Sequence, residues 1–558
     1  MSPKLSRSIL AVVAMGALTL TACGGGGDST TGEKIDTAKT EYQQTAYEDV
    51  KDGGTLVTAI EEISPQQNTF HADGTRYTSD IWKWYNPQLA LFDAKGTYSF
   101  NKEYLKEVKE ETSGNKTKVT FVFRDEAKFN DDTPIDWTAI EATWKISNGK
   151  DPAYNPSSTD GYERITSVTK GATDKEAVVE FDGAYPWWQG LFNYVVHPAV
   201  VDPANYNDYL KKVHPEWGAG PFKVESVDFN KGEATFVKNE KWWGRPGKLD
   251  KRVFRQMEDS AALNAFKNGE IDYTRNANKE RYSALKDMPN TEQIVGPMPS
   301  TSLFVLNGKA PHLSDIKVRE AVATAIDREQ IGKIRFNGIP YEEKSPGSLQ
   351  VYSFQSDIYK DNYSQVVPKA DPAKAQKLLE EAGYTKGTDG VYEKDGQKLS
   401  IRYTLLGDSE VSRAMAQATQ KMLKDTGIDC QIQQRPSSEF STVTRERDFD
   451  LFPMAFTAGD PFGVAYFGQT YLSNSQLNRS DTGWPELDEK IRKLQELPTQ
   501  KEQIDRANEL EVEALKRFGV IPMYNGPIMV RHKAGVVNID VDAPGFTTTA
   551  VETVGWKK

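Results

Sequence analysis

Histidine and cysteine are scarce in this chain of 558 residues, which has five histidines and two cysteines. No two histidines are four residues apart and there is no His-Glu-x-x-His segment, so a zinc site has no local support. The chain also lacks a Walker loop, a Gly-x-Gly-x-x-Gly segment and a Gly-x-Ser-x-Gly segment. We therefore expect no metal, no cofactor and no catalytic residues.

Long apolar runs are also missing, apart from one near the start. Ile9 to Leu20 is apolar except for Thr19, and it is shorter than the roughly 20 residues that span a bilayer. Lys4 and Arg7 precede it, so residues 1–22 are predicted to be a secretory signal peptide. The sequence Leu20-Thr21-Ala22-Cys23 resembles a bacterial lipobox. This resemblance implies that Cys23 is lipidated and holds the chain on the outer face of the cell membrane. An ordinary signal peptide with an incidental cysteine is the alternative.

Residues 23–50 contain few aliphatic side chains and many Gly, Ser, Thr and charged residues. Such a segment buries too little apolar surface to offset its chain entropy, so we predict a lipidated N-terminus followed by a flexible tether. The folded body is expected to begin near Gly53. The formal net charge of −11 argues against a nucleic-acid partner.

The body mixes strand and helix patterns without simple alternation, which favours α/β lobes. Val119, Phe121 and Phe123 alternate as in a half-buried strand. A helix is predicted from Asp371, its N-cap, to a stop at Gly383. Other predicted features are a helix from Ser314 with an apolar stripe, and a packed, unreactive Cys430 in a strand.

Five segments resemble motifs of the family 5 extracellular solute-binding proteins, the peptide- and nickel-type receptors of ABC importers. They occur in the family's order and span about residues 53 to 545. Asp132 stands where the family has glycine, and Trp137 where it has alanine. The actinobacterial dipeptide- and oligopeptide-binding lipoproteins are the most similar branch. The segments are AKFNDDTPIDWTAIEATWKI (127–146), GAGPFKVESVDFNKGEATFVKNEKWWG (218–244), ALNAFKNGEIDYT (262–274), FVLNGKAPHLSDIKVREAVATAIDREQI (304–331) and DPAKAQKLLEEAGY (371–384).

The resemblance implies an α/β, two-lobed periplasmic-binding-protein-like fold with a hinge and an extra third domain (cluster C type). Ligand would lie in the cleft between domains I and III and would shift a pre-existing equilibrium toward the closed form. The implied domains are I (51–95, 217–308 and 526–558), II (96–216) and III (309–525).

Candidate ligand-binding residues also follow from the resemblance. The segment 449–471 corresponds to a Trp-x-x-Asp-like segment of related receptors, in which the aspartate binds the peptide α-ammonium. Asp460 is therefore the candidate for that role, and a plain turn aspartate before Pro461 is the alternative reading. On the facing lobe, a cleft strand would supply backbone contacts, and Asn307 would sit near the hinge. The remaining candidates are Phe456, Thr457, Ala458 and Gly459 around Asp460, and Glu62, Ile63 and Ser64 on the facing strand.

The expected function is a membrane-anchored, monomeric receptor that captures oligopeptides and delivers them to an ABC permease and ATPase complex, with no catalysis. A buried peptide needs a partner for each N–H and C=O, which a strand edge supplies, and a carboxylate for its amine. Three alternatives stay open: the same scaffold binding heme, a metal chelate or another small solute; a secreted hydrolase with a non-local carboxylate pair; and a structural or signalling lipoprotein.

Overall fold

A computed structural model describes residues 34–37, 42–113 and 115–558. The predicted signal peptide and Cys23 lie outside these residues. Within the described ranges, no helix is both long and apolar enough to cross a bilayer.

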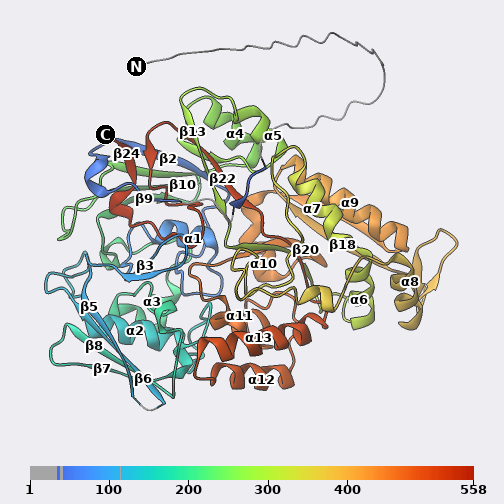
Figure 1. Cartoon of the computed structure of the whole chain (residues 1–558), viewed down its shortest axis with the longest axis horizontal. Helices are drawn as coiled ribbons and strands as arrows, with labels where there is room; N and C mark the ends of the chain where they lie inside the picture. The colour runs from blue at the N-terminus through green and yellow to red at the C-terminus, as the bar shows by residue number, and fades with distance from the viewer. Residues whose placement is uncertain (1–33, 38–41, 114) are drawn as a thin grey trace, which may run out of the picture.

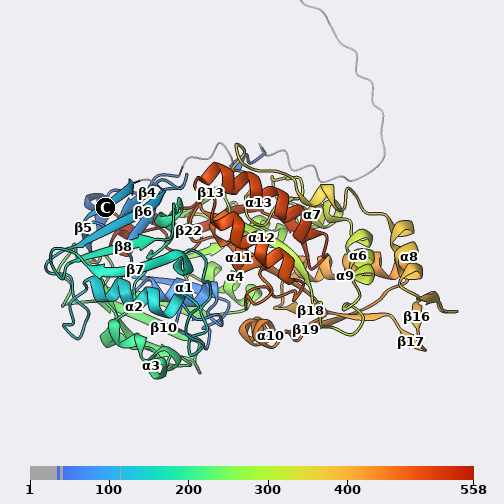
Figure 2. The same cartoon turned by 90° about the horizontal axis from the view of Figure 1, so that it is seen from below.

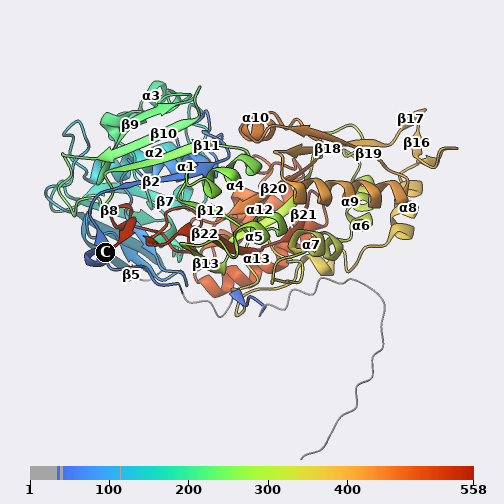
Figure 3. The ribbon, with the colours of Figure 1, turned by 90° about the horizontal axis from the view of Figure 1, so that it is seen from above.

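Two large sheets form the centres of two lobes (Figures 1 and 3). The seven-stranded sheet has the order β13-β22-β12-β2-β11-β10-β9, and the five-stranded sheet has the order β19-β18-β20-β14-β21. The first comprises β2 (Thr55–Ile60), β9 (Phe222–Asp228), β10 (Glu233–Lys238), β11 (Lys251–Gln256), β12 (Tyr273–Arg275), β13 (Thr291–Pro297) and β22 (Pro527–Lys533). The second comprises β14 (Ser300–Leu306), β18 (Ser400–Leu406), β19 (Asp429–Arg435), β20 (Leu451–Thr457) and β21 (Val520–Tyr524).

The chain passes from one large sheet to the other between β13 and β14 and returns between β21 and β22. Asn525 links these two crossovers, because its Nδ2 donates to the Ser300 carbonyl at 2.9 Å and to Thr301 Oγ1 at 2.9 Å. The next residue, Gly526, has φ +81°, a conformation that favours glycine. The domain boundaries remain a prediction. They assign β14 to domain I, whereas the hydrogen bonds of β14 place it in the five-stranded sheet.

A third unit forms around a four-stranded antiparallel sheet of order β5-β6-β8-β7. Its core contains Val119, Phe121 and Phe123, which are all buried, as the alternating pattern predicts. Figure 2 shows α2 against this sheet, and α12 and α13 near the five-stranded lobe. The strands are β5 (Leu105–Ser113), β6 (Lys116–Phe123), β7 (Ile165–Lys170) and β8 (Glu176–Phe181).

Helices and shorter strands complete the fold. The helices are α1 (Arg76–Trp82), α2 (Trp137–Ser147), α3 (Pro203–Asn207), α4 (Asp259–Lys267), α5 (Lys279–Leu285), α6 (Ile316–Ala325), α7 (Arg328–Phe336), α8 (Pro372–Glu381), α9 (Glu410–Thr426), α10 (Phe440–Glu446), α11 (Phe467–Tyr471), α12 (Pro485–Gln495) and α13 (Gln500–Leu515). The short strands are β1 (Val50–Lys51), β3 (Ala90–Phe92), β4 (Tyr98–Phe100), β15 (Thr385–Lys386), β16 (Tyr392–Lys394), β17 (Gln397–Lys398), β23 (Val536–Val537) and β24 (Gly555–Lys557).

Local sequence signals set several of these elements. The Asp371 side chain accepts the Lys374 N–H and caps α8, and Gly383 follows the helix with φ +86°, as predicted. Helix α6 starts two residues later than the predicted Ser314, because the carboxylate of Asp315 caps it. Cys430 is 2 % exposed in β19, and burial raises the pKa of its thiol to about 12. It is a packed thiol, as predicted.

The prediction that the tether extends to residue 50 is wrong for its last part. Thr45 exchanges two hydrogen bonds with the Asn538 side chain, at 2.8 and 2.9 Å. The Tyr47 hydroxyl donates to the Pro246 carbonyl at 2.8 Å, and the Lys248 ammonium lies 4.0 Å from the centre of its ring. Composition could not show this docking, because every partner is about 200 or more residues away.

Substitution of Tyr47 by alanine tests whether this docking stabilises the body. Loss of the cation–π contacts with Lys248 and Arg245 and of the hydroxyl hydrogen bond should lower the free energy of unfolding by about 1–2 kcal/mol. Tyr47→Phe keeps the ring and should lose less than half of this. Urea unfolding of the three proteins measures the difference, and an alanine variant as stable as the parent would contradict the prediction.

Candidate functional site

Strand β20 has an edge without a partner strand. On one side it pairs with β14 along its whole length, from Leu451 to Thr457. On the other side, β18 pairs with it at a single position, Tyr403 with Leu451. In the described chain no strand pairs with residues 453–457 on that side. This edge therefore has backbone groups available for an extended ligand, and Pro453 at its start lacks an N–H.

The segment that follows β20 is open around its candidate residues. Thr457 and Gly459 are exposed, and Phe456 and Ala458 are half-buried. A Cβ added to Gly459 would meet no atom within 4 Å. The structure thus brings Phe456, Thr457, Ala458 and Gly459 together beside Asp460 on one accessible stretch.

Asp460 itself is 4 % exposed. Its Oδ1 accepts the Phe462 N–H at 2.9 Å, which is the turn contact expected of an aspartate before proline. Its Oδ2 accepts the Tyr466 hydroxyl at 2.6 Å and the Asn193 Nδ2 at 3.4 Å. Within the described residues no lysine, arginine or histidine forms an ion pair with it. Asp460 is a buried carboxylate whose partners are all neutral.

Burial without a counter-charge changes the acidity of this group. Desolvation raises the pKa of Asp460 to about 6, although the hydrogen bonds from Tyr466, Phe462 and Asn193 favour its ionised form. Burial, and after it the charge of Asp460, raise the pKa of Tyr466 well above its usual value. Asp460 is therefore a carboxylate whose ionised form has neutral hydrogen-bond donors but no counter-charge.

The sequence did not predict two residues that lie around Asp460, Gly190 and Asn193. They lie in the loop of residues 187–193, after β8 of the four-stranded sheet. The Tyr466 hydroxyl oxygen lies 3.1 Å from the Gly190 carbonyl oxygen, and a Cβ on Gly190 would lie 3.1 Å from the same hydroxyl. Asn193 is 267 residues from Asp460, so no local pattern could join them.

The facing candidates Glu62, Ile63 and Ser64 are buried, at 1 %, 5 % and 0 % exposure. The Ile63 N–H donates to the Gln256 side chain at 2.8 Å. Glu62 accepts the hydroxyl of Ser441 in α10 at 2.7 Å, and burial raises the pKa of Glu62. In the part of the chain described, none of these three residues is hydrogen-bonded to Asp460. Of the three, Glu62 joins the two large lobes through Ser441, whereas the partner of Ile63, Gln256, lies in the seven-stranded lobe.

Further contacts between these lobes lie near Glu62. The Ser437 hydroxyl donates to Glu258 at 2.8 Å, and Ser260 donates to Asp408. Arg479 donates to the Ala72 carbonyl at 3.1 Å. These hydrogen bonds therefore join the two large lobes in this structure.

The expectation that Asn307 lies near the hinge is wrong. Asn307 follows the last residue of β14, at the opposite end of that strand from the Pro297–Ser300 crossover. Its amide donates to the carbonyls of Arg447 and Phe449 at 3.3 and 3.0 Å. The motif correctly predicted that a strand ends at Asn307. That strand, β14, starts at the crossover and runs into the five-stranded sheet, so its last residue lies away from the crossover.

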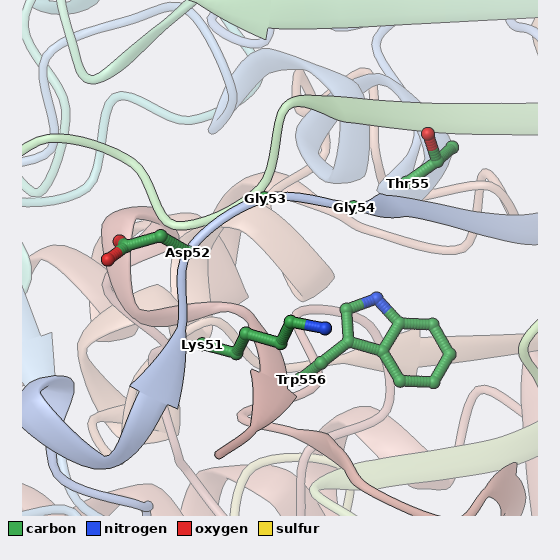
Figure 4. A pocket seen from close by; sticks show the side chains of 6 residues that line it. All are labelled: Lys51, Asp52, Gly53, Gly54, Thr55 and Trp556. Carbon is green, nitrogen blue, oxygen red and sulfur yellow. The ribbon is translucent and has the colours of Figure 1, made fainter.

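Two surface depressions lie elsewhere. One, of about 470 Å³, is where β1 meets β24, and Figure 4 shows the side chains of Lys51 and Trp556 side by side at its wall. The other, of about 460 Å³, includes His312, Arg402 and Asp450. Neither contains a predicted site residue. Among the described residues, no group of three or more His, Cys, Asp or Glu side chains is placed to hold a metal ion.

The raised pKa of Asp460 gives a prediction for stability. Its folded pKa of about 6 exceeds the unfolded value near 3.8, so the protonated form favours folding. That contribution is complete below about pH 4 and is lost as the pH rises through 6. Asp460→Asn should therefore have a free energy of unfolding about 3 kcal/mol above that of the parent at pH 8, and so a higher melting temperature, and show little difference at pH 4.

Thermal unfolding of ligand-free protein at pH 4, 6 and 8 measures this difference. Asp132→Asn is the matched control, because hydrogen bonds from Lys128 and Lys241 lower the pKa of Asp132 to about 2 and its substitution should not stabilise at pH 8. A stability gain for Asp460→Asn that is the same at all three pH values would show that the carboxylate's charge is not its cause.

Comparison with known proteins gives the family. Residues 94–478, more than half of the chain, match the bacterial extracellular solute-binding proteins, family 5 Middle. The oligopeptide-binding protein OppA of Mycobacterium tuberculosis is 29 % identical over 514 residues, which cover 89 % of this chain and 85 % of OppA.

Two solved structures show the same fold. The periplasmic EDTA-binding protein EppA has a TM-score of 0.78 and 24 % identity, and covers 95 % of this chain and 100 % of its own. The oligopeptide-binding protein AppA from Bacillus subtilis, in complex with a nonapeptide, has a TM-score of 0.75 and 19 % identity. It covers 91 % of this chain and 100 % of its own. The predicted two-lobed α/β fold with an extra domain is confirmed. The chain belongs to the bacterial extracellular solute-binding proteins of family 5.

Proposed function

We propose that this solute-binding protein is the receptor of an ABC importer for oligopeptides, and that it binds the peptide α-ammonium at Asp460. The observation that carries the proposal is the unpartnered edge of β20, which leads directly to a buried carboxylate with no cationic partner in the described chain. An extended peptide offers both a backbone for such an edge and a cation for such a carboxylate.

The direction of the strand fixes the direction of the peptide. Asp460 lies three residues beyond the end of β20, so a peptide with its amine there runs back along the strand, antiparallel to it. Alternate residues of β20 face the free side, because the Ala458 N–H donates to the Pro299 carbonyl on the β14 side. The free side therefore has the backbone groups of Ala455 and Thr457 and the carbonyl of Pro453, which suits about four peptide residues. Because the main chain makes these contacts, we expect weak dependence of affinity on peptide sequence.

Closure of the lobes would complete the site. The contacts Ser441–Glu62 and Ser437–Glu258 join the two large lobes. A peptide that touches both lobes would shift the equilibrium toward the form that has these contacts. The name of the related OppA and the nonapeptide bound to AppA agree with a peptide ligand. The related EppA binds EDTA, so chelates are the control ligands.

Binding of tripeptides and tetrapeptides tests the proposal. Calorimetry should detect peptides with a free amine, and N-acetylated versions should bind at least tenfold more weakly. Asp460→Ala should weaken free-amine peptides by about 100-fold and acetylated peptides by less than fivefold, because it removes the only charged partner of the amine. Binding of EDTA–metal complexes but of no peptide, or equal losses for the two peptide classes, would contradict it.

We also propose that Cys23 carries the lipid that anchors the receptor beside its permease and ATPase complex, as a monomer on the outer face of the cell membrane. Cys23→Ser should abolish metabolic labelling with a radiolabelled fatty acid and release the protein from the membrane fraction. Peptide affinity should be unchanged, because the folded body lies beyond this residue. Cys430→Ser is the control, since this thiol is buried, and it should keep the label. Continued labelling of Cys23→Ser would contradict the anchor.

A further inference from the structure

Of the two polar atoms in the Asn193 side chain, one has a hydrogen-bond partner and the other has none within the described residues. Its Nδ2 donates to Asp460 Oδ2 at 3.4 Å. Its Oδ1 is enclosed and has no hydrogen-bond partner within the described residues. A buried carbonyl oxygen without a donor costs free energy, so native proteins satisfy nearly all such groups. Here the unsatisfied oxygen belongs to a side chain that already contacts the candidate carboxylate.

The backbone holds Asn193 in this place. The Asn193 carbonyl accepts the Leu89 N–H at 2.8 Å, and the Phe192 N–H donates to the Tyr162 hydroxyl at 3.1 Å. Phe192 has φ +56°, a left-handed conformation that costs free energy in a bulky residue and that the surroundings must impose. The side chain of Asn193 is therefore positioned by a strained, anchored turn rather than by a free loop.

Acceptors outnumber donors where this turn meets Asp460. The acceptors are the two carboxylate oxygens, Asn193 Oδ1 and the Gly190 carbonyl. Besides Asn193 itself, the donors are the Tyr466 hydroxyl and the Phe462 N–H. Of these acceptors, Asn193 Oδ1 lacks a donor, and Asp460 lacks a counter-charge. A ligand that meets both needs supplies an N–H and a positive charge. A primary ammonium supplies three N–H groups and one charge.

Other ligand classes fit these groups less well. A carboxylate or phosphate would face a second anion. A Ca²⁺ ion takes six to eight oxygen ligands, and one carboxylate and one amide oxygen are too few. An N-acetylated peptide offers one N–H and no charge.

We propose that Asn193 is a second ligand of the peptide α-ammonium, so that the amine is bound between Asp460 of the five-stranded lobe and Asn193 of the unit around the four-stranded sheet. This inference rests on the proposed function. It gives the third unit a direct part in recognition, because the loop of residues 187–193 would contribute a side chain to the ligand. It also makes Asn193 a determinant of selectivity for free amines.

A structural role is the competing explanation. Protonated Asp460 could donate to Asn193 and join the two loops with no ligand present. In that case removal of the Asn193 amide would destabilise the ligand-free protein and weaken all peptides alike. A role in ammonium binding predicts the opposite pattern, with unchanged or raised stability and a selective loss of affinity.

The test measures three ligands with the full mature chain: a tripeptide, its N-acetyl form and its desamino form. Asn193→Leu, which has nearly the same shape, should weaken the free tripeptide by 10- to 100-fold and the other two by less than threefold. Its ligand-free melting temperature should equal or exceed that of the parent. Asn193→Ala is a second variant in case leucine does not fit. Gln500→Ala is the matched control, because Gln500 holds the same loop at the Pro186 carbonyl without contacting Asp460.

The outcomes separate the two proposals. Equal losses for all three ligands, a lowered melting temperature with equal losses, or no loss for the free tripeptide would overturn the role of Asn193. If Asp460→Asn abolishes the preference for the free amine while Asn193→Leu retains it, the peptide function stands and the Asn193 ligand does not. If the parent protein binds none of the three ligands, the proposed peptide-binding function is contradicted, and the role of Asn193 falls with it.

Discussion

Two crossovers between the large sheets determine how the lobes of this protein are arranged. The chain passes between the sheets at Pro297–Ser300 and at Tyr524–Pro527, and Asn525 hydrogen-bonds across from one crossover to the other. The carboxylate of Glu343 accepts the N–H groups of Asn525 and Gly526, and burial raises its pKa. Both connections thus lie side by side, which is the arrangement that a hinge between two lobes requires.

Buried carboxylates with neutral partners occur at the contacts between structural units. Glu62 accepts from Ser441 between the large lobes, and Asp460 accepts from Asn193 and Tyr466 between the five-stranded lobe and the third unit. Asp160 accepts from the Gln469 N–H and the Gln495 side chain, and burial raises its pKa to about 7. By contrast, Asp540 in the core of the seven-stranded lobe is paired with Arg252. Glu62, Asp460 and Asp160 thus lie where units meet, and a cation that reaches Asp460 with a ligand would find a carboxylate without a counter-charge.

Much of the fold could be predicted from the sequence because its signals are local. The cap and stop of α8, the alternation in β6 and the packed Cys430 each depend on residues within one element. The resemblance of five ordered motifs extended these signals to the whole two-lobed architecture, which the comparisons confirm. The site was only partly predictable. Asp460 and its preceding residues lie together in one segment, whereas Asn193 and Gly190 come from a loop that no nearby motif connects to it.

The sequence by itself determined the elements, their order and the family, because each follows from short-range periodicity, capping and motif order. It could not determine that residues 42–50 dock on the body, that Asn307 lies away from the crossovers or that Asp460 has only neutral partners. Those features depend on which distant segments meet and on what water they exclude. Tertiary packing alone decides the desolvation of a carboxylate and the availability of a strand edge, since both are properties of the assembled surroundings rather than of any stretch of chain.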